Sequence, residues 1–158
     1  MTIYHQLAIA APIERVYLAL STAGGVSTWW DKQTPVETAE GLVLEHYPGA
    51  KHGVVRLRVL TQIVNKRIEW VCISEHPPES PVSVWTETHF IFDLSEHDSP
   101  AATIERDCDL SGSREKRMTT VNFRQTNYDE SSIYAGFNNF AWALVLSNLK
   151  RVCESQSS

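Results

Sequence analysis

Residues 131–154, SSIYAGFNNFAWALVLSNLKRVCE, decide the fold of this chain. Nothing in this stretch breaks a helix except Gly136, and Ser131 or Ser132 could cap its start. Its apolar residues cover a broad arc of the helix surface, which predicts a helix that is buried on more than one side. Such a helix needs a concave partner, and a strongly bent sheet supplies one.

Strand-like segments fill most of the chain before this helix. Strands are expected over 2–10, 34–38, 41–47, 54–64, 67–74, 84–94 and 118–128, where apolar residues alternate with polar ones or run together between turn signals. A short helix is expected over 12–21, beginning at Pro12, and a second one over roughly 25–30, after the break at Gly24-Gly25. Runs of strands between segregated helices indicate an α+β fold with an antiparallel sheet.

The whole chain, residues 1–158, is predicted to be one domain. Residues 95–117 are the least regular part and are expected to form a loop insertion around a possible extra strand at 102–108. This segment could form a lid over the mouth of a cavity or be a disordered loop. Long surface insertions cost little free energy, which favours the loop. The tail at 155–158 is expected to fray.

The bulk composition is that of an ordinary globular protein, with 42% hydrophobic and 21% charged residues. The formal net charge of −5 gives no electrostatic reason to expect binding to nucleic acid or to an anionic membrane surface. No stretch approaches the roughly 20 apolar residues of a membrane helix, and no signal peptide is recognised. The three cysteines, Cys72, Cys108 and Cys153, form no CxxC pair, so a reducing, cytoplasmic location is expected.

Several segments, taken in order, resemble one known superfamily. They are AAPIERVYLALS at 10–21, the pair Trp29-Trp30 after a glycine break, Ile68-Glu69-Trp70, the strand at 90–94, and the ending WALVLSNLKRVCE at 142–154, which has the spacing WxxxLxxLKxxxE. This pattern resembles the START-like (SRPBCC) helix-grip superfamily, and more narrowly its branch named after the activator of Hsp90 ATPase. The resemblance covers nearly the whole chain.

This resemblance implies a START or Bet v 1-like architecture, in which a curved antiparallel sheet wraps around a long C-terminal helix, with two short helices after the first strand. It also implies an apolar cavity between sheet and helix. It does not imply one activity, because the superfamily includes ligand binders, cyclases and co-chaperone modules.

Large apolar residues on the predicted strands and the final helix are the candidates for lining such a cavity. Ligand pockets are mostly apolar with a few placed polar groups, and several hundred Å³ is their usual volume. A filled core is the alternative, and the sequence alone does not separate the two. The candidate lining residues are Trp30, Tyr47, Leu57, Trp70, Phe90, Phe92, Phe123, Phe137, Ala141 and Trp142.

Polar residues give no comparable signal. Strand alternation places Arg56, Arg58, Glu87 and His89 on the outer face of the sheet. If the strand curvature reverses a face, Arg56 or Glu69 becomes an inward polar anchor. The six histidines form no metal-binding motif, and His46 and His52 are expected in a solvated loop around a turn. There is no GxSxG motif and no glycine-rich phosphate loop, and Cys72 is expected to be an inert buried thiol. No metal, cofactor or catalytic residue is therefore predicted.

Three functions remain open. The first is binding of a small hydrophobic molecule in an internal cavity, in a stress-related or regulatory role. The second is a chaperone-associated interaction module of the Hsp90 ATPase activator type. The third is a cyclase-like or dehydratase-like enzyme acting on a hydrophobic substrate, which would need a positioned acid or base. A second copy of the chain is a further candidate partner, through an exposed aromatic strand edge.

Overall fold

A computed structural model describes residues 1–98 and 117–155 of the chain. In chain order the elements are β1 (Ile3–Ile9), α1 (Ile13–Ser21), α2 (Ala23–Val26), β2 (Thr34–Thr38), β3 (Gly41–His46), β4 (Val55–Ile63), β5 (Arg67–Cys72), the 3₁₀ helix η1 (Pro81–Trp85), β6 (His89–Asp98), β7 (Arg117–Thr126) and α4 (Ala135–Ser155). The described strands form one sheet in the order β1-β7-β6-β5-β4-β3-β2, and all neighbours run antiparallel.

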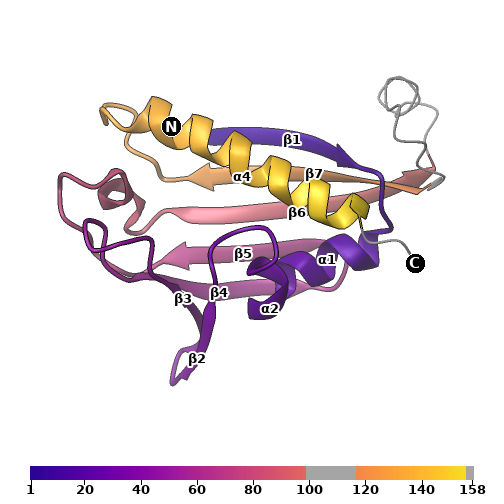
Figure 1. The fold of residues 1–158 in the computed structure, drawn as a ribbon, viewed down its shortest axis with the longest axis horizontal. Helices are drawn as coiled ribbons and strands as arrows, with labels where there is room; N and C mark the ends of the chain where they lie inside the picture. The colour runs from indigo at the N-terminus through magenta and orange to yellow at the C-terminus, as the bar shows by residue number, and fades with distance from the viewer. Residues whose placement is uncertain (99–116, 156–158) are drawn as a thin grey trace.

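The sheet curves around α4, which crosses its concave face together with α1 and α2 (Figure 1). Strand alternation produces this arrangement, because Phe90 and Phe92 of β6 and Phe123 of β7 all point to the concave face. On α4 the residues that meet them are Trp142, Leu146, Leu149 and Cys153, which recur at helical spacing and are buried. The α+β helix-grip architecture with two short helices after the first strand is thus confirmed.

One predicted strand is wrong over part of its length. Residues 84–88 were expected to begin a strand, but Pro81–Trp85 form η1 and β6 begins only at His89. The Ser80 side chain caps this short helix by accepting a hydrogen bond from the Val82 N–H at 3.1 Å, and Pro81 suits its first turn. Glu87, with φ of 66°, then turns the chain into β6.

The final helix begins later than predicted. Side chains hold the preceding residues in turns, because Asp129 accepts a hydrogen bond from the Ser131 N–H at 2.9 Å and Ser132 accepts one from the Tyr134 N–H at 3.1 Å. The helix continues to Ser155, one residue into the expected tail.

The predicted insertion at 95–117 is shorter than expected at both ends. Residues 95–98 belong to β6, and Arg117 begins β7, because the two strands pair from His89↔Thr126 as far as Asp98↔Arg117. The possible strand at 102–108, Cys108 and residues 156–158 lie outside the described residues.

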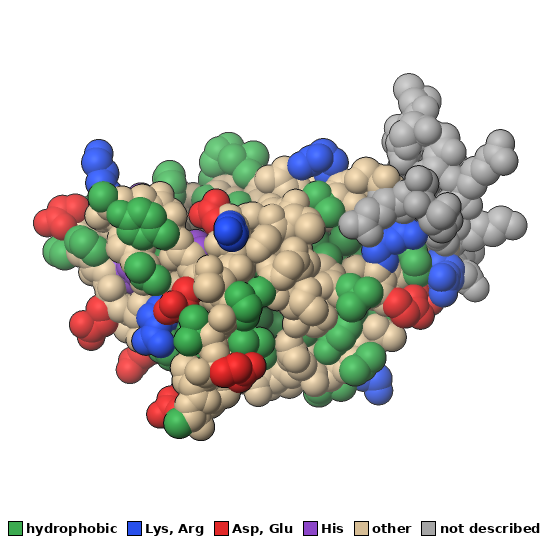
Figure 2. Space-filling model, turned by 60° about the horizontal axis from the view of Figure 1, so that its bottom comes forward, with side chains coloured by type: hydrophobic (Ala, Val, Ile, Leu, Met, Phe, Trp, Pro, Cys, Tyr) green, Lys and Arg blue, Asp and Glu red, His purple; other side chains and the backbone are tan. Residues whose placement is uncertain are grey.

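The surface carries both signs of charge. On the face turned forward in Figure 2, acidic and basic side chains are interspersed with apolar ones and gather into no single basic patch. No helix among residues 1–98 and 117–155 has the length and apolar character needed to cross a bilayer.

Candidate functional site

Seven aromatic side chains meet between the sheet and α4. They are Trp30, Trp70, Trp85, Phe90, Phe92, Phe123 and Trp142, and we call them the aromatic cluster. The centroids of the Phe123 and Trp142 rings are 4.4 Å apart, and those of Trp70 and Phe92 are 5.1 Å apart. All seven are buried except Trp30, which is half-buried and lies against Trp70, Trp85 and Trp142.

The structure brings most of the predicted lining residues together. Six of the ten belong to the aromatic cluster, and Leu57 of β4 is fully buried in the same core. Ala141 is half-buried on the flank of α4. Trp85 joins the cluster from η1, although it was expected in a strand.

Tyr47 and Phe137 lie outside this interior, each with 61% of its surface exposed. Tyr47 follows the last residue of β3, where the strand has already left the sheet. Phe137 lies five residues before Trp142, which is about 140° away around a helix of 3.6 residues per turn. The broad apolar arc of α4 therefore includes residues that the domain itself does not cover.

At one end of the aromatic cluster the buried polar groups are all hydrogen-bonded. The Trp142 Nε1–H donates to Gln125 Oε1 at 3.1 Å, and Gln125 Nε2 donates to the Thr88 hydroxyl at 3.0 Å. The Trp85 Nε1–H donates to Asn138 Oδ1 at 3.2 Å, and Asn138 Nδ2 donates to the Tyr128 hydroxyl at 2.6 Å. These bonds fix α4 to the sheet, because an unpaired amide in this position would carry its full desolvation cost.

At the other end the Trp70 Nε1–H is fully buried and has no hydrogen-bond partner among the described residues. Leaving a buried donor unpaired costs about 1–3 kcal/mol. The contrast with Trp29 is direct, since the Trp29 Nε1–H donates to the Ala19 carbonyl at 2.7 Å. Trp70 thus presents an unused donor inside an otherwise apolar region.

His46 lies at the same end, and its buried position corrects the prediction of a solvated loop. It is the last residue of β3, and its ring centroid is 4.6 Å from that of Trp30. Its Nδ1–H donates to Gln33 Oε1 at 3.2 Å, which leaves Nε2 of the neutral ring as an acceptor. Burial, and secondarily the positive charge that His76 can carry, lower the pKa of His46 from 6.5 to about 4.

A second polar cluster ties the two loops next to His46 together. His76 Nδ1 donates to the His52 carbonyl at 2.5 Å, so its Nε2 accepts from the Ser74 hydroxyl at 2.8 Å. The Ser74 oxygen also accepts from the Arg56 N–H at 3.0 Å. Burial raises the pKa of the nearby Cys72 thiol, which agrees with the expected inert thiol. Within residues 1–98 and 117–155, no three His, Cys, Asp or Glu side chains are grouped closely enough to hold a metal ion.

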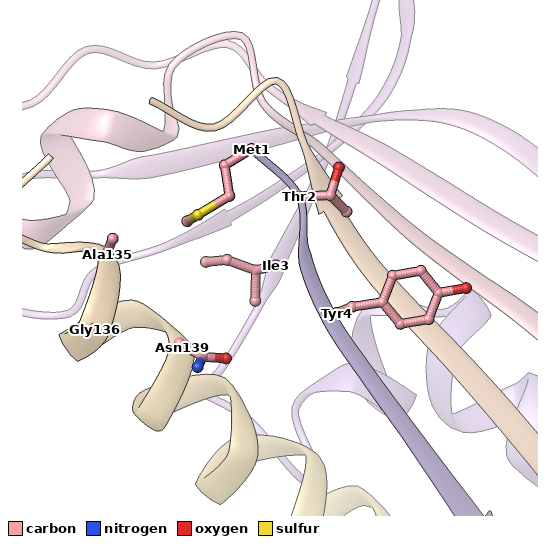
Figure 3. A pocket seen from close by; sticks show the side chains of 7 residues that line it. All are labelled: Met1, Thr2, Ile3, Tyr4, Ala135, Gly136 and Asn139. Atoms are coloured by element: carbon pink, nitrogen blue, oxygen red, sulfur yellow. The ribbon is translucent and has the colours of Figure 1, made fainter. Parts of the chain in front are cut away.

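Two open grooves run along the seam between β1 and α4, away from the aromatic cluster. The larger has a volume of about 460 Å³, with the Met1 and Ile3 side chains pointing toward Ala135 and Asn139 of α4 (Figure 3). The smaller, of about 150 Å³, lies further along α4, between Leu7 and Lys150. None of the ten predicted lining residues borders either groove.

Comparisons with known proteins identify the fold. No protein-family model matches the chain, and no curated protein matches its sequence. Solved structures do match: the Aha1 dimer from Colwellia psychrerythraea has a TM-score of 0.71 at 23% sequence identity, covering 100% of this chain and 99% of that one. Protein MLL2253 from Mesorhizobium loti has a TM-score of 0.71 at 15% identity and covers 100% of both chains.

A further match is CalU16 from Micromonospora echinospora, with a TM-score of 0.65 at 14% identity, covering 99% of this chain and 76% of that one. These likenesses show the helix-grip fold. At these identities they assign no activity, because this fold carries many functions.

Proposed function

We propose that this protein binds a small, mainly apolar molecule that carries one hydrogen-bond acceptor, at the Trp30 and Trp70 end of the aromatic cluster. The observation that carries the proposal is the buried, unpaired Trp70 Nε1–H. Buried polar groups in native proteins are almost always paired, so an exception calls for a missing partner. An acceptor atom of a ligand supplies one.

The surroundings of Trp70 fit such a molecule. The ring centroids of Trp30 and Phe92 lie 6.4 and 5.1 Å from that of Trp70, so the ligand would be surrounded mostly by aromatic surface. His46 is neutral at physiological pH because its pKa is about 4, so it adds hydrogen-bonding capacity without charge. A neutral ligand is therefore favoured over an anion, because none of the described Lys or Arg side chains is buried to compensate a negative charge.

Trp30 is the side chain that would move to admit the ligand. It is the one member of the aromatic cluster that is not fully buried, and it follows the short helix α2 in the loop before β2. Its ring covers Trp70, Trp142 and His46. Rotation of this ring would uncover the unpaired donor and open the predicted cavity, which makes the site a minor-state pocket that a ligand stabilises.

The proposal is tested with two probes of similar shape, 2-acetylnaphthalene, which has a carbonyl acceptor, and 2-ethylnaphthalene, which has none. Titration followed by Trp fluorescence is expected to saturate for both. The ketone is expected to bind roughly fivefold tighter, since a net hydrogen bond contributes about 1 kcal/mol. In Trp70→Phe both probes are expected to bind equally.

Trp85→Phe is the matched control, because the Trp85 N–H is already committed to Asn138. This variant is expected to keep the preference for the ketone. A preference that survives in Trp70→Phe, or the absence of saturable binding by either probe, would contradict the proposal.

Two alternative functions are a chaperone-associated module and an enzyme of the cyclase type. The Aha1 match supports a chaperone-associated module as the second candidate, and the narrower Hsp90 ATPase activator branch with it. Stimulation of Hsp90 ATPase by the purified chain would favour that function. For an enzyme of the cyclase type, the Ser74–His76 pair is the nearest acid–base arrangement, but the bonds that Ser74 makes to Arg56 and His76 are those of a loop anchor.

We also propose a cytoplasmic location, because Cys72 and Cys153 are free thiols.

A further inference from the structure

The outward face of α4 carries a continuous apolar stripe. Ile133, just before the helix, is 87% exposed, and Phe137, Phe140 and Leu144 are 61%, 66% and 54% exposed. We call these four residues the α4 stripe. Within α4, Phe137, Phe140 and Leu144 are spaced by three and four residues, the heptad spacing that places side chains along one seam of a helix, and Ile133 lies in the turn before it. In Figure 1 no other described element lies over the side of α4 that faces away from the sheet.

The sequence around the stripe carries no charged residue, which is unusual for an exposed helix. Residues 131–149 contain no Asp, Glu, Lys or Arg. A surface helix normally carries charged side chains on its solvent face, and an uncharged apolar face marks an interaction site. The sequence pattern predicted a helix buried on more than one side, and one copy of the domain buries only the side of Trp142 and Leu149.

We propose that a second copy of this chain covers the α4 stripe, with the two helices packed antiparallel across a twofold axis. This inference goes beyond the proposed ligand binding and does not depend on it. The charges at the two ends of the stripe are the reason for choosing a second copy. Glu130 is exposed in the segment before α4, and Arg151 is exposed near the end of α4, seven residues after Leu144. Antiparallel pairing brings the segment that carries Glu130 in each copy toward Arg151 of the other.

Within α4 an antiparallel register pairs apolar side chains. When Phe137 lies opposite Leu144, Phe140 lies opposite the small Ala141, and Ile133, before the helix, lies toward Asn148. The Phe140 ring then meets a small residue, as ridges-into-grooves packing favours. A twofold axis repeats each of these contacts, so every favourable pair occurs twice.

The area is sufficient for a modest dimer. A fully exposed aromatic side chain has about 150–250 Å² of surface, so Phe137 and Phe140 together expose roughly 250 Å² per copy, to which the exposed Ile133 and Leu144 add. Flanking half-exposed residues such as Ala141 extend it toward the ~800 Å² per partner of a specific interface. The dimer is therefore expected to dissociate on dilution.

Sedimentation equilibrium of the purified chain tests the proposal. Between about 1 and 500 µM the mass is expected to rise from 17.9 kDa toward twice that value, as for a micromolar dimer. Phe140→Asp places two charges at the twofold axis and is expected to weaken association at least roughly 30-fold. Leu18→Asp, at a 60% exposed leucine of α1, is the matched control and is expected to leave the dimer intact. A monomeric wild-type chain over this range, or a dimer that survives Phe140→Asp, would overturn the proposal.

A charge exchange then tests the register. Glu130→Arg and Arg151→Glu each set like charges against one another in both symmetry-related pairs, and each is expected to weaken the dimer roughly tenfold at low salt. The double variant restores opposite charges and is expected to recover wild-type association. If the double variant is weaker than both single variants, the antiparallel register is wrong. Because all of these positions are exposed, the unfolding temperature of each monomer serves as a check that folding is unaffected.

Discussion

The two ends of the aromatic cluster differ in how their buried polar groups are hydrogen-bonded. At the Trp142 end each buried indole and amide group has a partner, and the partners come from α4, β7, η1 and Thr88, the residue just before β6. At the Trp70 end an indole N–H of the same kind is equally buried and has none among the described residues. Hydrogen bonds at the first end hold the helix in the sheet. At the second end the His46–Gln33 hydrogen bond joins β3 to the loop before β2, and the Trp70 N–H adds no bond to any described residue. The difference indicates where the core can open without losing the fold.

The largest loss of stability is expected from a substitution at the Trp142 end, where the buried polar groups are hydrogen-bonded. Trp142→Ala removes an indole that packs on Phe123 and Phe90 and leaves the Gln125 carbonyl group without its donor. Loss of a buried Trp costs about 3–5 kcal/mol, so the free energy of unfolding is expected to fall by about 4 kcal/mol. Urea denaturation followed by circular dichroism measures this change. A loss below about 1 kcal/mol would mean that this end is not the anchor of α4.

The pH dependence of stability probes the other end through His46. Its pKa is about 4 in the folded protein and 6.5 when unfolded, so between these values the unfolded chain binds a proton that the folded chain excludes. Stability is therefore complete above pH 6.5 and falls as pH drops toward 4, by about 3 kcal/mol in total. Unfolding curves at several pH values should show this loss, and His46→Gln should flatten that part of the profile. An unchanged slope in the variant would show that His46 titrates normally.

A smaller loss of stability is expected from a substitution in the hydrogen-bond network at the Trp142 end. Gln125→Leu keeps the approximate size of the side chain but removes the acceptor of the Trp142 N–H and the donor to Thr88. The unpaired indole is expected to lower the free energy of unfolding by about 2 kcal/mol. Thr126→Val, at a half-buried position on the other face of β7, is a suitable control and should change stability by less than about 0.5 kcal/mol. Equal effects of the two substitutions would argue against the network.

Much of this arrangement could be predicted from the sequence because strand alternation is a strict rule. The alternation of β6 and β7 places Phe90, Phe92 and Phe123 on one face, and the structure has them there. The same rule could have found His46, since Leu42, Leu44 and His46 alternate along β3. The turn signal of Pro48-Gly49, just after β3, points the other way and favours a solvent-exposed histidine.

Other features of the site have no comparable signal in the sequence. The short helix η1 replaces part of a strand because Ser80 and Pro81 start a turn that outweighs the β-propensity of Val84 and Trp85. The exposure of Phe137 depends on which side of α4 the sheet reaches, and an apolar arc alone does not define that. The missing partner of Trp70 is a property of three-dimensional packing, so only coordinates reveal it.

The finest comparison uses the same substitution at both ends. Trp142→Phe and Trp70→Phe remove the same atoms from two buried indoles, so their packing losses are similar. Trp142→Phe also leaves Gln125 Oε1 unpaired, whereas Trp70→Phe removes a donor that has no partner among the described residues. The first variant is therefore expected to be less stable than the second by about 1 kcal/mol. Parallel urea titrations of the ligand-free proteins measure this difference directly. If Trp70→Phe is instead the less stable variant, the Trp70 N–H has a partner in solution, and the contrast between the two ends disappears.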